Sequence, residues 1–115
     1  MKPASIVNLQ HPLPEKSATE HFQTLLERPG VRLERIVSDG QVSPPGFWFD
    51  QAEDEWVLLL TGAAALEYGD GTRVELGVGD ALLIPAGYRH RVAFTAPRTV
   101  WLALFCAAQG DGVPR

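Results

Sequence analysis

The sequence predicts a single all-β domain, a sandwich or barrel of short strands. Short apolar runs recur at intervals of roughly 8 to 12 residues between positions 31 and 106, and glycine-rich turns separate them. Two of these runs, residues 56–60 and 100–105, are apolar at every position, which indicates strands covered on both faces. A chain of 115 residues has room for one hydrophobic core.

The N-terminal region, residues 1–30, is predicted to form an extended arm and then a short helix. The arm is expected over residues 1–16, which contain three prolines and show no sustained periodicity. Ser17 and Glu20 have the spacing of a capping box, in which each side chain binds a backbone N–H of the other residue. Apolar residues then repeat three and four positions apart up to a Pro-Gly pair that ends the pattern. The sequence therefore predicts a helix near residues 18–27.

The strands follow from position 31 onward. Polar and apolar residues alternate from Val31, which predicts a first strand, and Ser43-Pro44-Pro45-Gly46 forms a rigid corner before the apolar strand at 56–60. Gly62 then bends the chain into a hairpin that turns at Gly69-Asp70-Gly71. Further strands are expected at residues 81–84, 89–95 and 99–106. The β-domain is thus assigned to residues 31–108, and a flexible tail to residues 109–115.

The segment from Gly79 to His90 combines four features at fixed spacing. Gly79 is a turn glycine, an apolar strand follows it, Pro85 and Gly87 form a Pro-x-Gly corner, and His90 ends the segment. This segment resembles the second motif of the cupin family, G-x5-P-x-G-x2-H-x3-N, with Phe94 at the asparagine position. The resemblance implies a double-stranded β-helix, or jelly-roll barrel, with the short N-terminal helix outside it.

The first cupin motif, H-x-H followed by E-x6-G, matches only at Glu55 and Gly62. Counting back from Glu55, the two histidine positions fall on Phe49 and Gln51, which share the inward face because side chains two apart point the same way. A bulge just before Glu55 would bring Asp50 inward in place of Gln51. Both histidines of the motif are thus missing.

The polar residues that the resemblance gathers inside the barrel are Gln51, Glu55 and His90. In metal-binding cupins the corresponding positions present imidazoles and one carboxylate to iron, manganese or zinc. Here an amide and a phenyl ring replace two imidazoles. The resemblance therefore implies either no cofactor or a weakly bound divalent metal whose ligands are Gln51, Glu55 and His90.

Two further roles remain open for the same residues. In one, they form a hydrogen-bonded polar pocket that binds a small molecule without turnover. In the other, His90 and Glu55 are the acid/base pair of a metal-free isomerase, epimerase or lyase, because a carboxylate beside an imidazole raises its basicity and fixes its tautomer. In either role we expect a small-molecule ligand whose pocket is lined by Phe49, Gln51, Tyr88 and Arg89.

Composition excludes several other classes of protein. A net charge of -4 and an isoelectric point near 5.2 give no basic surface for nucleic acid. Cys106 is the only cysteine, so an intrachain disulfide is impossible. The sequence shows neither a signal peptide nor a long apolar run, so we expect a cytoplasmic protein without membrane contact. The doubly apolar strands predict more outer apolar surface than one helix covers, and hence a homodimer.

Overall fold

The computed structural model describes residues 5–108, and within them the chain forms strands and loops without any helix. The expected flexible tail at residues 109–115, and residues 1–4 of the expected arm, lie outside the described residues. The described part of the arm is an irregular segment that precedes the first strand at His21. Among the described residues, no helix is long and apolar enough to span a membrane.

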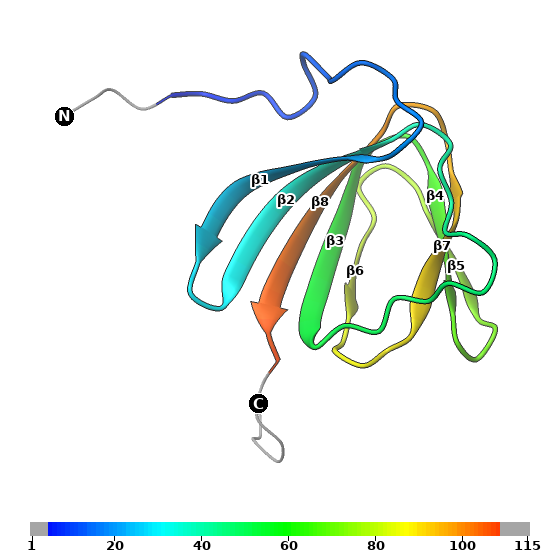
Figure 1. Cartoon of the computed structure of the whole chain (residues 1–115). Coiled ribbons are helices and arrows are strands. Elements are labelled where there is room, and N and C mark those ends of the chain that lie inside the picture. Colours follow the sequence, from blue (N-terminus) through cyan, green and yellow to red (C-terminus); the bar gives the residue numbers. More distant parts are fainter. Residues whose placement is uncertain (1–4, 109–115) are drawn as a thin grey trace.

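Between residues 5 and 108, eight strands form two antiparallel sheets that face each other (Figure 1). The five-stranded sheet has the order β1 (His21–Arg28), β2 (Val31–Ser38), β8 (Thr99–Ala107), β3 (Glu53–Thr61) and β6 (Ala81–Ile84). The three-stranded sheet has the order β5 (Arg73–Leu76), β4 (Ala64–Tyr68) and β7 (His90–Thr95). After β5, each strand lies in the opposite sheet to the one before it, as the jelly-roll expectation requires.

The predicted N-terminal helix is wrong, because residues 21–28 form the edge strand β1. Its backbone pairs with β2 from His21 to Arg28, with a register shift between Thr24 and Leu26. This bulge breaks the period-two alternation of apolar residues, so their spacing in the sequence matches that of a helix. An isolated helix of this length is marginal in water, whereas pairing with β2 satisfies the backbone of the segment along a whole strand.

The expected capping box is also absent. The Ser17 hydroxyl accepts a hydrogen bond from the backbone N–H of Thr19, at 3.3 Å, and so closes a local turn. The Glu20 carboxylate accepts a hydrogen bond from Ser38 at the end of β2. Ser17 and Glu20 therefore bind different parts of the molecule instead of each other's backbone.

The hydrophobic core lies between the two sheets. Alternate residues of β3 point inward, so that Val57 and Leu59 are buried beside Ala103 and Trp101 of β8. Leu66 of β4 covers them from the other sheet and belongs to the same buried cluster. The opposite residues of β3, including Trp56, face away from the core. One face of this strand is therefore buried in the core, and the other lies on the outside of the sheet.

Candidate functional site

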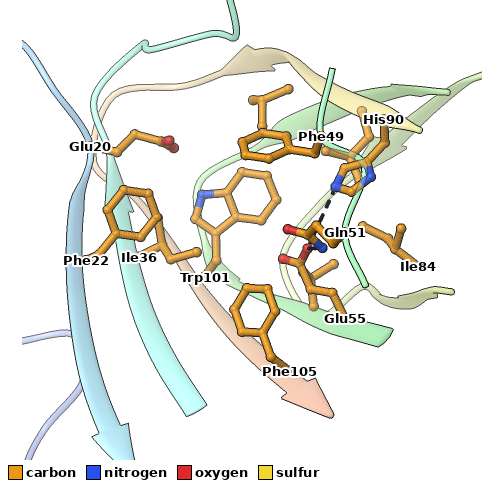
Figure 2. A pocket seen from close by; sticks show the side chains of 13 residues that line it. Glu20, Phe22, Ile36, Phe49, Gln51, Glu55, Ile84, His90, Trp101 and Phe105 are labelled. Carbon is orange, nitrogen blue, oxygen red and sulfur yellow. Dashed lines mark hydrogen bonds and ion pairs between the residues drawn. The ribbon is translucent and has the colours of Figure 1, made fainter. Parts of the chain in front are cut away.

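A pocket opens between the two sheets, with an empty volume of about 570 Å³ including its mouth (Figure 2). Most of its wall is apolar, with contributions from β2, β3, β4, β6 and β8: Ile36, Val57, Leu66, Ile84, Trp101 and Phe105. Phe22 of β1 also lines the pocket but is 57% exposed, which places it at the mouth.

Three of the predicted polar residues meet at one end of this pocket. The Gln51 amide donates a hydrogen bond to Glu55 Oε1, at 3.0 Å, and His90 Nε2 lies 3.7 Å from the same oxygen. His90 is 4% exposed and Glu55 8% exposed, so both are removed from bulk water. Figure 2 shows the three side chains directed toward one another. The structure therefore brings Gln51, Glu55 and His90 together, as the resemblance to cupins implies.

The tautomer of His90 follows from its second contact. His90 Nδ1 lies 2.9 Å from the backbone carbonyl oxygen of Tyr88. A carbonyl only accepts hydrogen bonds, so Nδ1 carries a hydrogen in both charge states of the ring. Nε2 is consequently the nitrogen that gains and loses the proton, and it is the one that faces Glu55 and the pocket.

The surroundings of His90 raise its pKa above the ordinary value of 6.5. Burial alone lowers this pKa, since it disfavours the charged ring, but the neighbouring Glu55 carboxylate and the Tyr88 carbonyl together outweigh it. The ring of Phe49 stacks on the imidazole at a centroid distance of 5.3 Å and an interplanar angle of 24°. An aromatic face stabilises a cation placed over it, so this contact also favours the protonated ring.

The backbone explains how two distant segments bring these side chains together. Phe49 and His90 form an isolated β-bridge. The Phe49 N–H donates to the His90 carbonyl with a nitrogen–oxygen distance of 2.7 Å, and the His90 N–H donates to the Phe49 carbonyl at 3.1 Å. The Gly87 N–H donates to the Gln51 carbonyl at 2.8 Å, so the Pro-x-Gly corner is fixed to the segment that precedes β3. Phe49 and Gln51, two residues apart, therefore face the same pocket, as alternation predicts.

The remaining predicted pocket residues lie elsewhere. Asp50 is exposed, so Gln51 and not Asp50 faces the interior. Tyr88 is 58% exposed and lies with Arg89 around a separate surface hollow beside Tyr68. The expectation that Tyr88 and Arg89 line the pocket is thus not met. The Pro-x-Gly corner turns their side chains outward, and Tyr88 contributes only its backbone carbonyl to the site.

Sequence reasoning missed a second polar group at the other end of the pocket. Trp101 Nε1 donates to the Ser38 hydroxyl at 3.0 Å, and that hydroxyl donates to the Glu20 carboxylate. Both Trp101 and Glu20 line the pocket. Alternation along the last strand is the signal that finds Trp101. Because the sequence pattern assigns Glu20 to a helix cap, it does not predict that Glu20 lines the pocket.

The donors in the pocket do not fit a tightly bound divalent metal. The described residues contain no group of three His, Cys, Asp or Glu side chains that could hold a metal ion. Phe49, at the position of a motif histidine, offers no lone pair, and an amide oxygen from Gln51 is a weak, neutral ligand. Glu55 Oε1 also already accepts the Gln51 hydrogen bond.

Comparisons with solved structures agree with the fold of two facing sheets. A protein from Ralstonia eutropha JMP134, named as a candidate mannose-6-phosphate isomerase, is 47% identical, with a TM-score of 0.86 over 91% of this chain and 100% of that chain. A cupin superfamily protein from Desulfitobacterium hafniense DCB-2 is 19% identical, with a TM-score of 0.70 over 82% of this chain and 83% of that one. An RmlC-like cupin from Shewanella frigidimarina NCIMB 400 is 17% identical, with a TM-score of 0.67 over 86% of both chains.

A search of curated proteins gives no match. The family model of the cupin domain, in contrast, matches residues 35–105, which is more than half of the chain and includes both segments that build the polar end of the pocket. With the motif residues, the two facing sheets and this match in agreement, the chain belongs to the cupin family.

Proposed function

We propose that this protein binds a small molecule in the pocket between its sheets, and that His90, Glu55 and Gln51 are the polar contacts of that molecule. The observation that carries the proposal is the burial of an imidazole–carboxylate pair at the end of an apolar pocket. Apolar walls with a few convergent polar groups are typical of ligand sites, since the walls supply affinity and the polar groups fix orientation.

The geometry gives each polar residue a separate task. His90 presents Nε2 toward the pocket, because Nδ1 is held by the Tyr88 carbonyl. Glu55 accepts from Gln51, which fixes the carboxylate beside the ring. A ligand hydroxyl or carbonyl placed at this end meets a proton donor and an acceptor that need no rearrangement. Preorganised groups of this kind bind more tightly than flexible ones because less entropy is lost.

A second candidate function is isomerisation, epimerisation or lyase chemistry in the same pocket. The 47% identity to the Ralstonia eutropha protein, named as a candidate isomerase, favours it. An isomerase of this kind removes a proton from a carbon beside a carbonyl and returns it to the neighbouring carbon, so it needs one base and one acid. A protonated His90 Nε2 as the acid and the Glu55 carboxylate as the base, 3.7 Å apart, provide both.

The test combines binding with turnover in matched variants. His90→Asn keeps a side-chain donor for the Tyr88 carbonyl and removes Nε2, and Glu55→Gln removes the charge with little change of shape. Tyr88→Phe is the control, because the Tyr88 side chain lies outside the pocket. We expect a panel of aldoses and small alcohols, assayed by calorimetry, to bind the wild type and the control but not the two pocket variants.

The same panel, followed by NMR for interconversion of each sugar, separates the two candidate functions. Turnover that disappears in His90→Asn and Glu55→Gln supports the acid/base role, whereas binding without turnover supports a binding protein. Binding that is unchanged in both pocket variants contradicts the proposal altogether.

A further inference from the structure

The mouth of the pocket carries a carboxylate that the polar trio does not use. Figure 2 shows Glu20 and Phe22 on one side of the Trp101 indole, and Gln51, Glu55 and His90 on the other. One Glu20 oxygen accepts from Ser38, whose own oxygen accepts from Trp101 Nε1. The other Glu20 oxygen has no hydrogen bond to any of the residues that the structure describes. This oxygen is available to a ligand.

The two carboxylates of the pocket differ in their charge partners. Glu55 lies 3.7 Å from His90 Nε2, so it has a partner that is a cation whenever the ring is protonated, and the surroundings raise the pKa of this ring. Glu20 forms no ion pair within residues 5–108, and none of the described residues that line the pocket is a lysine or arginine. Burial raises the pKa of Glu20 against the smaller effect of the Ser38 hydrogen bond. The charge of Glu20 is thus desolvated and uncompensated.

We propose that Glu20 determines the specificity of the pocket, and that the ligand carries a protonated amine that pairs with it. This inference rests on the proposed function, since it names the class of molecule that the pocket binds. Between Glu20 and the polar trio the wall is apolar, with Ile36, Trp101 and Phe105. The ligand is therefore an amine with an apolar body, whose far end reaches the trio.

The same arrangement disfavours anions. A phosphate or carboxylate entering the mouth meets the Glu20 charge, whereas the His90 ring lies across the Trp101 indole from Glu20 (Figure 2) and is already paired with Glu55. Like charges in a partly desolvated site repel strongly, whereas an ammonium gains a charge-assisted hydrogen bond. The sugar phosphate in the name of the Ralstonia eutropha protein is consequently a poor match for this pocket.

Three probes of six carbons each test the inference: n-hexylamine, 1-hexanol and hexanoate, each titrated at pH 7.5 by calorimetry. We expect n-hexylamine to bind at least about tenfold more tightly than 1-hexanol, a difference of ~1.4 kcal/mol. Hexanoate is expected to bind most weakly. Glu20→Gln should lower the affinity for n-hexylamine about tenfold, to that for 1-hexanol. Glu27→Gln, on the same strand as Phe22 but exposed and outside the pocket, is the charge-matched control.

The outcomes separate this inference from the proposed function. If 1-hexanol binds and Ile36→Trp abolishes its binding, the pocket is a ligand site. If n-hexylamine then binds no more tightly than 1-hexanol, the inference about Glu20 is overturned. If the amine preference persists in Glu20→Gln, Glu20 is not its source. If none of the three probes binds, the proposed function itself fails. The comparison of probes on the unaltered protein needs no variant, so it decides the question even where Glu20→Gln does not fold.

Discussion

The His90–Glu55 pair joins the stability of the protein to its pocket chemistry. Both side chains are buried, and the Tyr88 carbonyl fixes the ring so that only Nε2 can respond to Glu55 or to a ligand. A buried polar group costs free energy unless it is paired. Each member of the pair therefore compensates the burial of the other, and changes to either should be measurable in the free energy of unfolding.

Replacing Glu55 by Ala is expected to destabilise the protein by about 1 to 3 kcal/mol, because it leaves His90 and the Gln51 amide without their acceptor in the interior. Urea unfolding followed by tryptophan fluorescence measures this loss. Glu27→Ala, which removes an exposed carboxylate from β1, is the control and should change stability by less than about 0.5 kcal/mol. Equal stability of Glu55→Ala and wild type would show that the pair contributes nothing.

The raised pKa of His90 also predicts a pH dependence. Its folded pKa lies above the ordinary value of 6.5, so the folded state holds the proton more tightly than the unfolded state. The resulting stabilisation is fully present below about pH 6.5 and is lost as the pH rises through the folded pKa. Wild type should therefore lose stability relative to His90→Asn between pH 6 and pH 9 in urea unfolding. A difference between the two proteins that is constant with pH contradicts this account.

Removal of divalent metal is expected to leave the melting temperature nearly unchanged, since the donor set of Gln51, Glu55 and His90 is too weak for tight binding. Differential scanning calorimetry of the purified protein with and without EDTA measures the shift, and metal analysis of the same sample accompanies it. If stoichiometric metal co-purifies and its removal lowers the melting temperature by many degrees, the prediction is wrong and other residues supply the missing ligands.

At the scale of the elements, the turn after β3 shows why the first motif requires its glycine. Gly62 has φ +92°, and a Cβ built on it would lie 2.3 Å from Thr99 Oγ1 and 2.8 Å from Thr99 Cα. Thr99 is buried at the start of β8, so its backbone cannot move aside. The chain crosses from β3 into β4 at this point, and a side chain on Gly62 would separate the start of β8 from that crossing.

We expect Gly62→Ala to destabilise the protein strongly, by more than the ~1 to 3 kcal/mol that the left-handed conformation alone costs an alanine. Gly71→Ala is a matched control, because Gly71 has φ +90° and a Cβ added to it would meet no atom within 4 Å. The difference between the two variants in urea unfolding measures the contact with Thr99. Equal losses of stability in the two variants would mean that backbone strain alone explains the requirement for glycine at position 62, and that the contact with Thr99 does not contribute.

The elements also show how far sequence reasoning reaches. Strands β2 to β8 were predictable because period-two alternation, apolar runs and glycine turns mark them. Gln51, Glu55 and His90 were predictable as neighbours because the two motifs carry them. Strand β1 was not predictable, since a bulge gives its apolar residues the spacing of a helix. The place of Glu20 in the pocket, just before this strand, was therefore not predicted either. Residues 21–28 form a strand because they pair with β2, and the local sequence pattern does not encode this pairing.

At the scale of the molecule, the outer face of the five-stranded sheet presents a continuous apolar row. Leu33 pairs with Leu104, Leu104 with Trp56, and Trp56 with Leu83, so the row crosses four strands. The N-terminal arm reaches the backbone of Leu60 on this sheet through Gln10, away from the row. Leu83 is 55% exposed. Large exposed apolar surfaces of this kind are typical of subunit interfaces.

We therefore keep the prediction of a homodimer that buries this row. Leu83→Glu should dissociate it at micromolar concentration, because a carboxylate would be desolvated in the interface, and sedimentation velocity measures the change. Val78→Glu, which alters another exposed apolar residue in the turn before β6, is the control and should leave the dimer intact. A wild-type protein that sediments as a monomer at these concentrations contradicts the prediction.

A small molecule that binds in the pocket between the sheets through His90 and Glu55 must alter the surroundings of the His90 ring. The most direct test is NMR of the histidine side-chain nitrogens during titration with the six-carbon alcohol and amine probes, with His11 and His21, which lie outside the pocket, as internal references. The account predicts that Nε2 of His90 shifts on ligand addition while the reference histidines do not, and that the shift is lost in Glu55→Gln. Ligand binding that leaves the His90 nitrogens unmoved, or that shifts only signals around Tyr88 and Arg89, would contradict it.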